Sequence, residues 1–157
     1  MKNSIIILVG VAFLYACSGN DSKPTADAPA AAPVAKKEEK KPSDDSKGVG
    51  KFTNVELSPT LDNAMVERAQ KTYDLKCSAC HRLTGEKLVG PGWAGVTSRR
   101  KVEWVMNFVT NTDEMLNKNP AAQAMLETCL VRMPNQNVSD GEARDIYEFM
   151  RKNDGVK

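Results

Sequence analysis

Cys77, Cys80 and His81 are the residues of this 157-residue chain whose types and spacing best fit a chemical site. Two thiols at this spacing each form a thioether with a vinyl group of haem, and the histidine that follows lies under the iron as an axial ligand. The motif therefore predicts one covalently attached haem c, with Cys77 and Cys80 as attachment residues and His81 as the proximal iron ligand.

Two other uses of paired cysteines are open to this motif. A thioredoxin-like dithiol needs a βαβ surround, and no strand-like run precedes Cys77. A zinc site of Cys77, Cys80, His81 and Cys129 is possible by count, but adjacent Cys80 and His81 would both have to reach one ion. Haem attachment is the interpretation that the sequence favours.

The sixth iron ligand is a separate question, because His81 is the only histidine in the chain and ligation by two histidines is therefore excluded. Methionine, lysine, water or an open position remain. Met133 is the predicted ligand, since it lies on a polar loop stiffened by Pro134 and belongs to no apolar helical face. Met115 is ambiguous, and four other methionines occupy apolar helical positions typical of core filling: Met65, Met106, Met125 and Met150.

The N-terminus has the pattern of an export signal, with Lys2 followed by a short apolar run over residues 5–16. Its end, directly before Cys17, looks like a bacterial lipobox. Residues 1–16 are therefore predicted to be a lipoprotein signal peptide, and Cys17 the lipidated first residue of an exported protein anchored to a membrane on the periplasmic side. Ordinary signal cleavage that leaves Cys17 free is the alternative.

Composition divides the rest of the chain at about residue 50. Residues 17–50 are rich in Ala, Pro, Lys and Glu and lack apolar periodicity, which predicts a lipid-anchored, disordered linker. Residues 51–157 are of a size that suits one domain. The whole chain carries 22 Lys and Arg against 20 Asp and Glu, and this near balance gives no reason to expect nucleic acid as a partner.

The domain shows helical spacing and no convincing alternation, so we expect an all-α fold of about four to five helices. The first is predicted to begin at Pro59, with Ala64, Met65, Ala69 and Tyr73 on its buried side. A Gly- and Pro-rich loop over residues 84–95 follows. Later helices are expected over residues 102–109, over residues 120–130 with Ala121, Ala124, Met125 and Leu126 buried, and after a capping box formed by Ser139 and Glu142, with Ile146, Phe149 and Met150 facing inward.

Over residues 61–152 this pattern resembles the class I (mitochondrial-type) cytochrome c family, on the strength of Cys77, Cys80, His81 and Met133. The resemblance implies that the Pro91 carbonyl accepts the Nδ1 hydrogen of His81. It also implies that Arg99 or Arg100 binds a haem propionate, with a solvated surface pair as the alternative. Trp93 is expected to pack near the haem edge or a propionate, or else in the core. The segment between residues 111 and 131 departs from the family pattern, and its Cys129 is expected to be a buried, inert thiol.

These residues predict a monohaem, membrane-tethered one-electron carrier that is not an enzyme. The family resemblance suggests redox partner proteins, namely a membrane quinol-oxidising complex as donor and a terminal reductase or oxidase as acceptor. The sequence also resembles small cytochromes that accompany nitrous oxide reductase, which suggests that enzyme as one candidate acceptor. The alternative is a haem-based gas or redox sensor, or a small peroxidase-like enzyme, whose sixth ligand is displaceable; a peroxidase would need a distal base, and no second histidine exists to serve as one.

Overall fold

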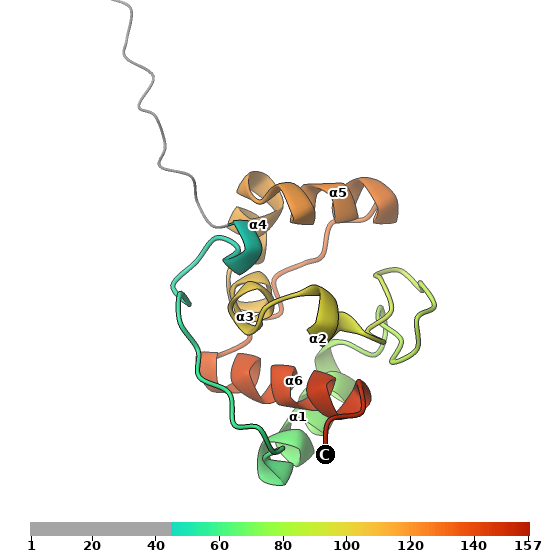
Figure 1. The fold of residues 1–157 in the computed structure, drawn as a ribbon. Helices are drawn as coiled ribbons and strands as arrows, with labels where there is room; N and C mark the ends of the chain where they lie inside the picture. Colours follow the sequence, from blue (N-terminus) through green and yellow to red (C-terminus); the bar gives the residue numbers. More distant parts are fainter. Residues whose placement is uncertain (1–44) are drawn as a thin grey trace, which may run out of the picture. The chain divides into compact units, whose positions relative to one another are not determined.

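The computed structural model describes residues 45–157, and the predicted signal peptide, Cys17 and most of the predicted linker lie outside these residues. Within this range the chain forms helices and no strand, apart from an isolated bridge between His81 and Lys87. The all-α prediction is confirmed, and α2 and α4 are the short helices beyond the expected number. The elements are the 3-10 helix η1 (Asp45–Lys47), α1 (Asn63–Lys76), α2 (Val96–Arg99), α3 (Val102–Thr110), α4 (Thr112–Lys118), α5 (Pro120–Cys129) and α6 (Asp140–Asn153) (Figure 1).

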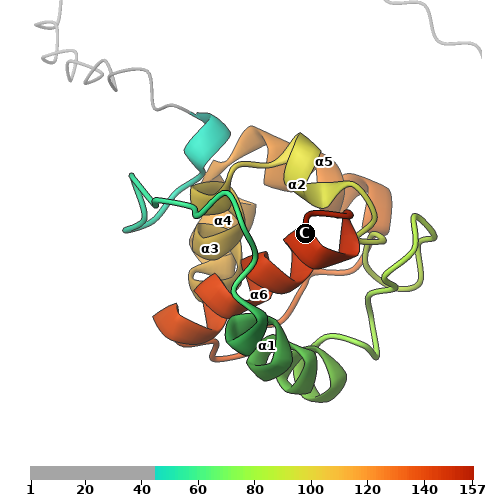
Figure 2. The same ribbon diagram turned by 60° about the horizontal axis from the view of Figure 1, so that its bottom comes forward.

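Helices α1 and α6 lie side by side and carry the principal helix contact of the described part (Figures 1 and 2). Ala69 of α1 and Ile146 of α6 are almost completely buried, and a small residue such as alanine lets two helix backbones approach closely. At the C-terminal end of α1, the ring of Tyr73 lies 5.5 Å from that of Phe149. This contact fixes the end of α1, from which the cysteine motif continues.

The first helix begins later than predicted, at Asn63 rather than Pro59. Asp62 is its N-cap, and its carboxylate accepts hydrogen bonds from the backbone of Ala64 at 2.9 Å and Met65 at 3.1 Å. A capping carboxylate satisfies the otherwise unpaired first amides of a helix, which a proline start does not do. The buried side is also shifted, because Val66 is buried with Ala69 and Tyr73 while Ala64 is exposed.

The predicted capping box at the start of α6 is confirmed. The Ser139 hydroxyl accepts from the Glu142 amide at 3.3 Å, and the Glu142 carboxylate accepts from the Ser139 amide at 2.8 Å. Ile146, Phe149 and Met150 are buried, as the apolar stripe of this helix predicts.

Residues 45–50, which we placed in the linker, contact the helices in the described part of the chain. Asn107 of α3 accepts from the Phe52 amide at 3.0 Å and donates to the Phe52 carbonyl at 2.9 Å. Asn119 likewise donates to the Asp45 carbonyl at 3.1 Å. Val49, Phe52 and Val55 also pack against the core, but the amide side chains that bond this segment lie far along the chain, and hydrophobic periodicity does not indicate such bonds.

Helix α5 buries less than its sequence predicts. Only Ala122 of this helix is fully buried, whereas Ala124 is exposed and Ala121 is partly exposed. The helix packs on α4, and its second apolar side lines a cavity instead of the protein core. Among residues 45–157, no helix is long and apolar enough to cross a bilayer.

Candidate functional site

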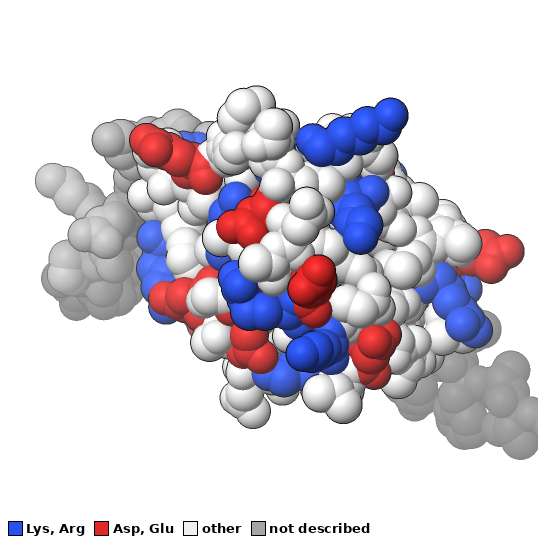
Figure 3. All heavy atoms as spheres, turned by 90° about the horizontal axis from the view of Figure 1, so that it is seen from below, with Lys and Arg blue, Asp and Glu red and all other residues white. Residues whose placement is uncertain are grey.

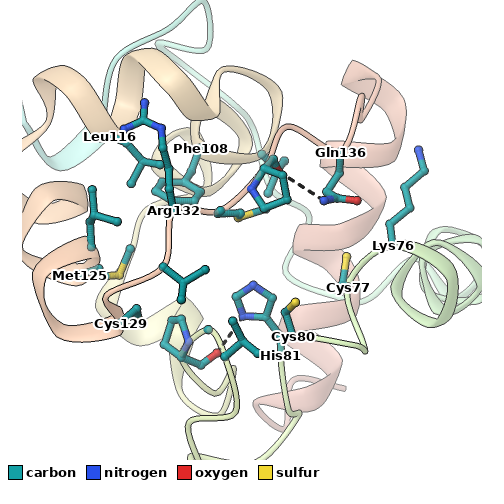
Figure 4. Close-up of a pocket in the computed structure, with 18 of the residues that line it drawn as sticks. Lys76, Cys77, Cys80, His81, Phe108, Leu116, Met125, Cys129, Arg132 and Gln136 are labelled. Carbon is teal, nitrogen blue, oxygen red and sulfur yellow. Dashed lines mark hydrogen bonds between the residues drawn. The ribbon is translucent and has the colours of Figure 1, made fainter.

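The cysteine motif continues α1 in a tight turn. Cys77 is the C-cap of α1, and its carbonyl accepts from the amides of Cys80 at 3.0 Å and His81 at 2.9 Å. These bonds fold the five residues back on themselves. As a result, the side chains of Cys77, Cys80 and His81 all point into one cavity, with Met125 and Cys129 on its other side (Figure 4).

The cavity around the motif continues into a second one, and the two share several apolar residues as a common wall. His81 is on the boundary between them. The shared residues are His81, Pro91, Trp93, Phe108, Val109, Met125 and Met133.

The His81 ring is oriented by its neighbours. Its Nδ1 lies 2.9 Å from the Pro91 carbonyl oxygen, which is the hydrogen bond that the family resemblance implies. The Tyr73 hydroxyl donates to the His81 carbonyl at 2.8 Å, and the Trp93 ring packs 5.6 Å from the imidazole. With Nδ1 engaged, Nε2 is left as the atom that ligates a metal, and the carbonyl acceptor raises its basicity.

Electrostatics favour the neutral imidazole. Burial lowers the pKa of His81, and the hydrogen bond to the Pro91 carbonyl opposes this shift only in part. A neutral imidazole is the form that binds iron. The ring is therefore held in the state and the direction that axial ligation needs.

Gly90 is a site residue that sequence reasoning missed. A Cβ atom at this position would lie 2.4 Å from Cε1 of His81, so no residue other than glycine fits beside the ring. The Gly90 amide also donates to the Cys80 carbonyl at 2.9 Å. The Gly90–Pro91 pair is typical of a turn or of a close approach of the backbone to another group, but nothing in the sequence indicated which side chain Gly90 faces.

The two alternative uses of the cysteines are not supported by the geometry. Burial raises the pKa of Cys77 to about 11, and this residue lies at a helix C-terminus, whereas a reactive dithiol needs a lowered pKa at a helix N-terminus. In the described part of the chain, no group of three or more His, Cys, Asp or Glu is arranged to hold a metal ion. The zinc site that included Cys129 is therefore not formed.

The opposite side of the cavity presents two thioethers. Met133 lines both cavities and is partly buried, as an axial ligand requires, but so does Met125, which the sequence assigned to the core. Met115 lines neither cavity; it is fully buried, and its sulfur accepts from the Val49 amide at 2.9 Å. Ligation by Met133 thus stays a prediction, with Met125 as the residue that tests it.

Cys129 is not the buried thiol that the sequence suggested. It is partly exposed and lines the first cavity, because the apolar side of α5 on which it lies faces the cavity and not the core. Two of its apolar neighbours in sequence, Leu130 and Val131, are exposed.

Arg99 and Arg100 both line the second cavity. Arg99 donates to the Ala94 carbonyl at 2.8 Å, and the Arg100 guanidinium stacks over Trp104, 4.5 Å from its ring centroid. Trp93 lies on the wall shared by both cavities and also packs on Tyr73. The propionate role of the arginines and the haem contact of Trp93 remain predictions, with all three residues placed where those roles need them.

This set of residues fits a covalently bound haem. Two thiols and an imidazole project from one turn, the walls are mainly apolar, thioethers lie opposite the imidazole, and two arginines lie at the second cavity, where they suit carboxylates. The match extends to Gly90, whose missing side chain leaves room for the ring of His81.

Comparisons with known proteins agree with this geometry. The family model described as Cytochrome c matches residues 66–154. Cytochrome c from Rhodothermus marinus has a similar structure, with a TM-score of 0.66 and 28% identity over 69% of this chain and 93% of that one. An engineered variant of the Rhodothermus protein, bound to a carbene intermediate, is similar with a TM-score of 0.63 and 27% identity over 69% of this chain and 94% of that one. The curated proteins gave no match. With a family model that covers more than half of its length, this chain belongs to the cytochrome c family.

Proposed function

We propose that this chain acts as a membrane-tethered monohaem carrier of single electrons, from a quinol-oxidising membrane complex to a terminal reductase or oxidase. The proposal builds on membership of the cytochrome c family, which makes the chain a haem protein that carries electrons, with haem c as its covalently bound cofactor and redox proteins as its partners. Haem c supplies a reversible one-electron iron couple when it is bound.

The observation that carries the proposal is the way in which His81 is held. Its ring is fixed by Pro91 on one side and by the space that Gly90 leaves on the other. A ligand that does not move between oxidation states keeps the reorganisation that accompanies electron transfer small. We therefore propose that His81 is the permanent proximal ligand and that Cys77 and Cys80 hold the haem in register with it.

The opposite wall favours a carrier over an enzyme. His81 is the only histidine in the sequence and is engaged on the proximal side, so no imidazole remains to act as a distal base. The opposing wall instead offers Met133 and Met125, whose thioethers stabilise the reduced iron. We propose that Met133 closes the sixth position, so that small molecules do not reach the iron.

Charge places few limits on the partner. On the face drawn in Figure 3, basic and acidic side chains are interleaved and do not form a large patch of one sign. Ion pairs within the described residues include Arg68 with Asp145 at 2.7 Å and Arg144 with the buried Glu148 at 2.6 Å. This face therefore provides little long-range electrostatic steering. The particular acceptor, including nitrous oxide reductase as one candidate, must be identified by measuring rates.

The anchor is proposed from Cys17, which precedes a stretch of Ala, Pro and charged residues. Lipid on Cys17 would hold the domain at the periplasmic surface of a membrane and shorten its search for membrane-bound partners. Mass spectrometry of the mature N-terminus tests this directly. The expected result is a lipidated Cys17; an unmodified residue after position 17, or an uncleaved Met1, would remove the anchor.

Potentiometric titration of the full-length protein tests the carrier itself. A carrier gives one reversible transition that fits a single one-electron couple, and it is reduced by membranes supplied with a quinol. Two transitions, or reduction that occurs only with artificial dyes, would contradict the proposal. Steady-state assays with purified terminal reductases and oxidases, nitrous oxide reductase among them, then rank the acceptors.

A further inference from the structure

The start of α2 is held by a carboxylate from the end of α6, and the two helices are in contact there (Figure 2). Gly95 is the N-cap of α2 and has no side chain that could cap the helix. Asp154, the C-cap of α6, takes this role. Its carboxylate accepts from the Gly95 amide at 2.6 Å, the Thr97 amide at 2.8 Å and the Thr97 hydroxyl at 2.7 Å.

This contact matters because α2 cannot form by itself. It has four residues, and a helix of this length is not stable in water without tertiary contacts. The first amides of a helix also need acceptors, which a capping side chain normally provides from within the same segment. In α2 that acceptor comes from Asp154, far along the chain. The position of α2 therefore depends on this carboxylate.

Arg99, the last residue of α2, folds back over the start of the helix. Its Nη1 donates to the Ala94 carbonyl at 2.8 Å. Gly95 has a φ of 70°, and a Cβ atom at this position would lie 2.8 Å from Nη1 of Arg99, so both the backbone and the close approach favour glycine. Arg99 thus lies against a residue whose amide Asp154 holds, and it lines the second cavity.

We propose that Asp154 is a positioning residue, which holds α2 so that Arg99 meets a haem propionate and raises the reduction potential. The inference rests on the proposed function, because the carboxylate that Arg99 would meet belongs to the bound haem. A guanidinium beside that carboxylate offsets its negative charge, and less negative charge near the iron favours the reduced state. Asp154 lines neither cavity, so its effect on the potential passes through Arg99.

The sign of the change in potential distinguishes this role from a direct effect of charge. Removal of the negative charge of Asp154 would by itself favour the reduced haem and raise the potential. Loss of the position of α2 would instead withdraw Arg99 from the propionate and lower the potential. Positioning and direct charge therefore predict opposite results for the same variant.

Asp154→Asn tests the proposal by potentiometric titration of the full-length holoprotein. Asparagine keeps the size of the side chain but places an NH₂ group where one carboxylate oxygen accepted hydrogen bonds. At a fixed solution potential, the ratio of reduced to oxidised haem should fall about three-fold, as expected when one ion pair near the surface is loosened. For a one-electron couple this is a fall of about 30 mV. Thr97→Val, which removes only the hydroxyl bond, should give a smaller fall in the same direction.

Double variants identify the arginine through which Asp154 acts. In the Arg99→Gln background, Asp154→Asn should no longer lower the ratio, whereas in the Arg100→Gln background it should lower the ratio as before. Asp145→Asn is the matched control on α6, because its carboxylate accepts two hydrogen bonds from Arg68 of α1, at 2.7 and 2.8 Å, and not from α2. This control should lower the melting temperature without lowering the ratio.

The outcomes separate this inference from the proposed function. If the unmutated protein lacks a single reversible one-electron transition, the carrier function fails. If the transition is normal but the ratio is unchanged or raised in Asp154→Asn, the positioning role is wrong; Thr97→Val decides this if Asp154→Asn does not fold. An equal fall in the Arg99→Gln background, or its loss in the Arg100→Gln background, would show that Asp154 does not act through Arg99.

Discussion

The two sides of the haem cavity are built in different ways. On the His81 side, short hydrogen bonds join residues that are near in sequence, such as His81 to Pro91 and Gly90 to Cys80, both at 2.9 Å. On the opposite side, the loop that carries Met133 makes bonds within itself, such as Gln136 to the Pro134 carbonyl at 3.3 Å. Arg132 ties that loop to α4 through Asp113.

This difference shows which side is fixed by the chain alone. On the His81 side the chain itself orients the ring, through a hydrogen-bond acceptor, a close backbone neighbour and an aromatic contact. The Met133 side has two thioethers facing the cavity and no such bonds to select between them. We infer that bound haem fixes which of these two thioethers lies at the iron.

The largest effect is expected from the cysteines. Replacing both Cys77 and Cys80 by alanine should abolish covalent haem and most of the helical circular dichroism, because the macrocycle fills the space between the two sides. The His81 side should keep the most residual structure, through the contact of α1 with α6. A double variant with native helicity and thermal stability but without haem would show that the cofactor is not part of the core.

Gly90→Ala should disturb the position of the ring on the His81 side of the cavity. The added Cβ atom would lie 2.4 Å from the His81 ring, so the ring or the backbone must move. Overpacking of this kind costs about 1–3 kcal/mol, to be measured by chemical unfolding of the holoprotein, and a displaced ligand should also raise the high-spin fraction. Gly85→Ala, in the same loop with open space around its Cβ position, should change neither quantity.

Met133→Ala sharpens the comparison on the other side. It should abolish the weak far-red sulfur-to-iron charge-transfer band of the oxidised protein and lower the reduction potential by on the order of 100 mV, since a thioether favours reduced iron. Met125→Ala and Met115→Ala should leave the band in place. If the band persisted in Met133→Ala and vanished in Met125→Ala, the ligand assignment would move to α5.

The smallest effect concerns acid stability near the end of α1. The Ser139 amide and then Lys76 lower the pKa of Glu142 to about 2 from an ordinary value of 4.5. A lowered pKa in the folded state means that this contribution is complete above pH 4.5 and is lost as the pH falls toward 2.

Glu142→Gln should therefore reduce the free energy of unfolding at neutral pH by about 1 kcal/mol and flatten its loss in acid. Denaturant unfolding at a series of pH values measures both quantities. Glu127→Gln, at an exposed position of α5, is the control. An identical acid limb in Glu142→Gln and the unmutated protein would contradict the assignment.

The sequence predicted best what is encoded locally. The spacing of Cys77, Cys80 and His81 predicts haem attachment without any other information. The capping box is recognisable because Ser139 and Glu142 lie within one helical turn. The start of α1 was wrong because Asp62 competes with Pro59 as a cap, and both residues are compatible with a helix start. The contacts of residues 45–52 with the helices were not predicted, because Asn107 and Asn119, which bond them, lie far along the chain.

The Met133 side was harder to predict for a physical reason. A helix with one face on the protein and another on a cofactor shows the same apolar periodicity as a helix buried on both faces. The residues Met125 and Cys129 of α5 therefore read as core, whereas the structure places them on the cavity wall. Gly90 was missed similarly, since its role depends on the ring that it faces.

Carbon monoxide binding tests most directly whether the two sides together form a closed, one-electron site. The reduced full-length protein is titrated with carbon monoxide at neutral pH and followed by its optical spectrum. A carrier with His81 on one side and a methionine on the other should keep its low-spin spectrum unchanged. Rapid formation of a carbon monoxide complex by the unmutated protein would show an open or displaceable sixth position and would contradict the account.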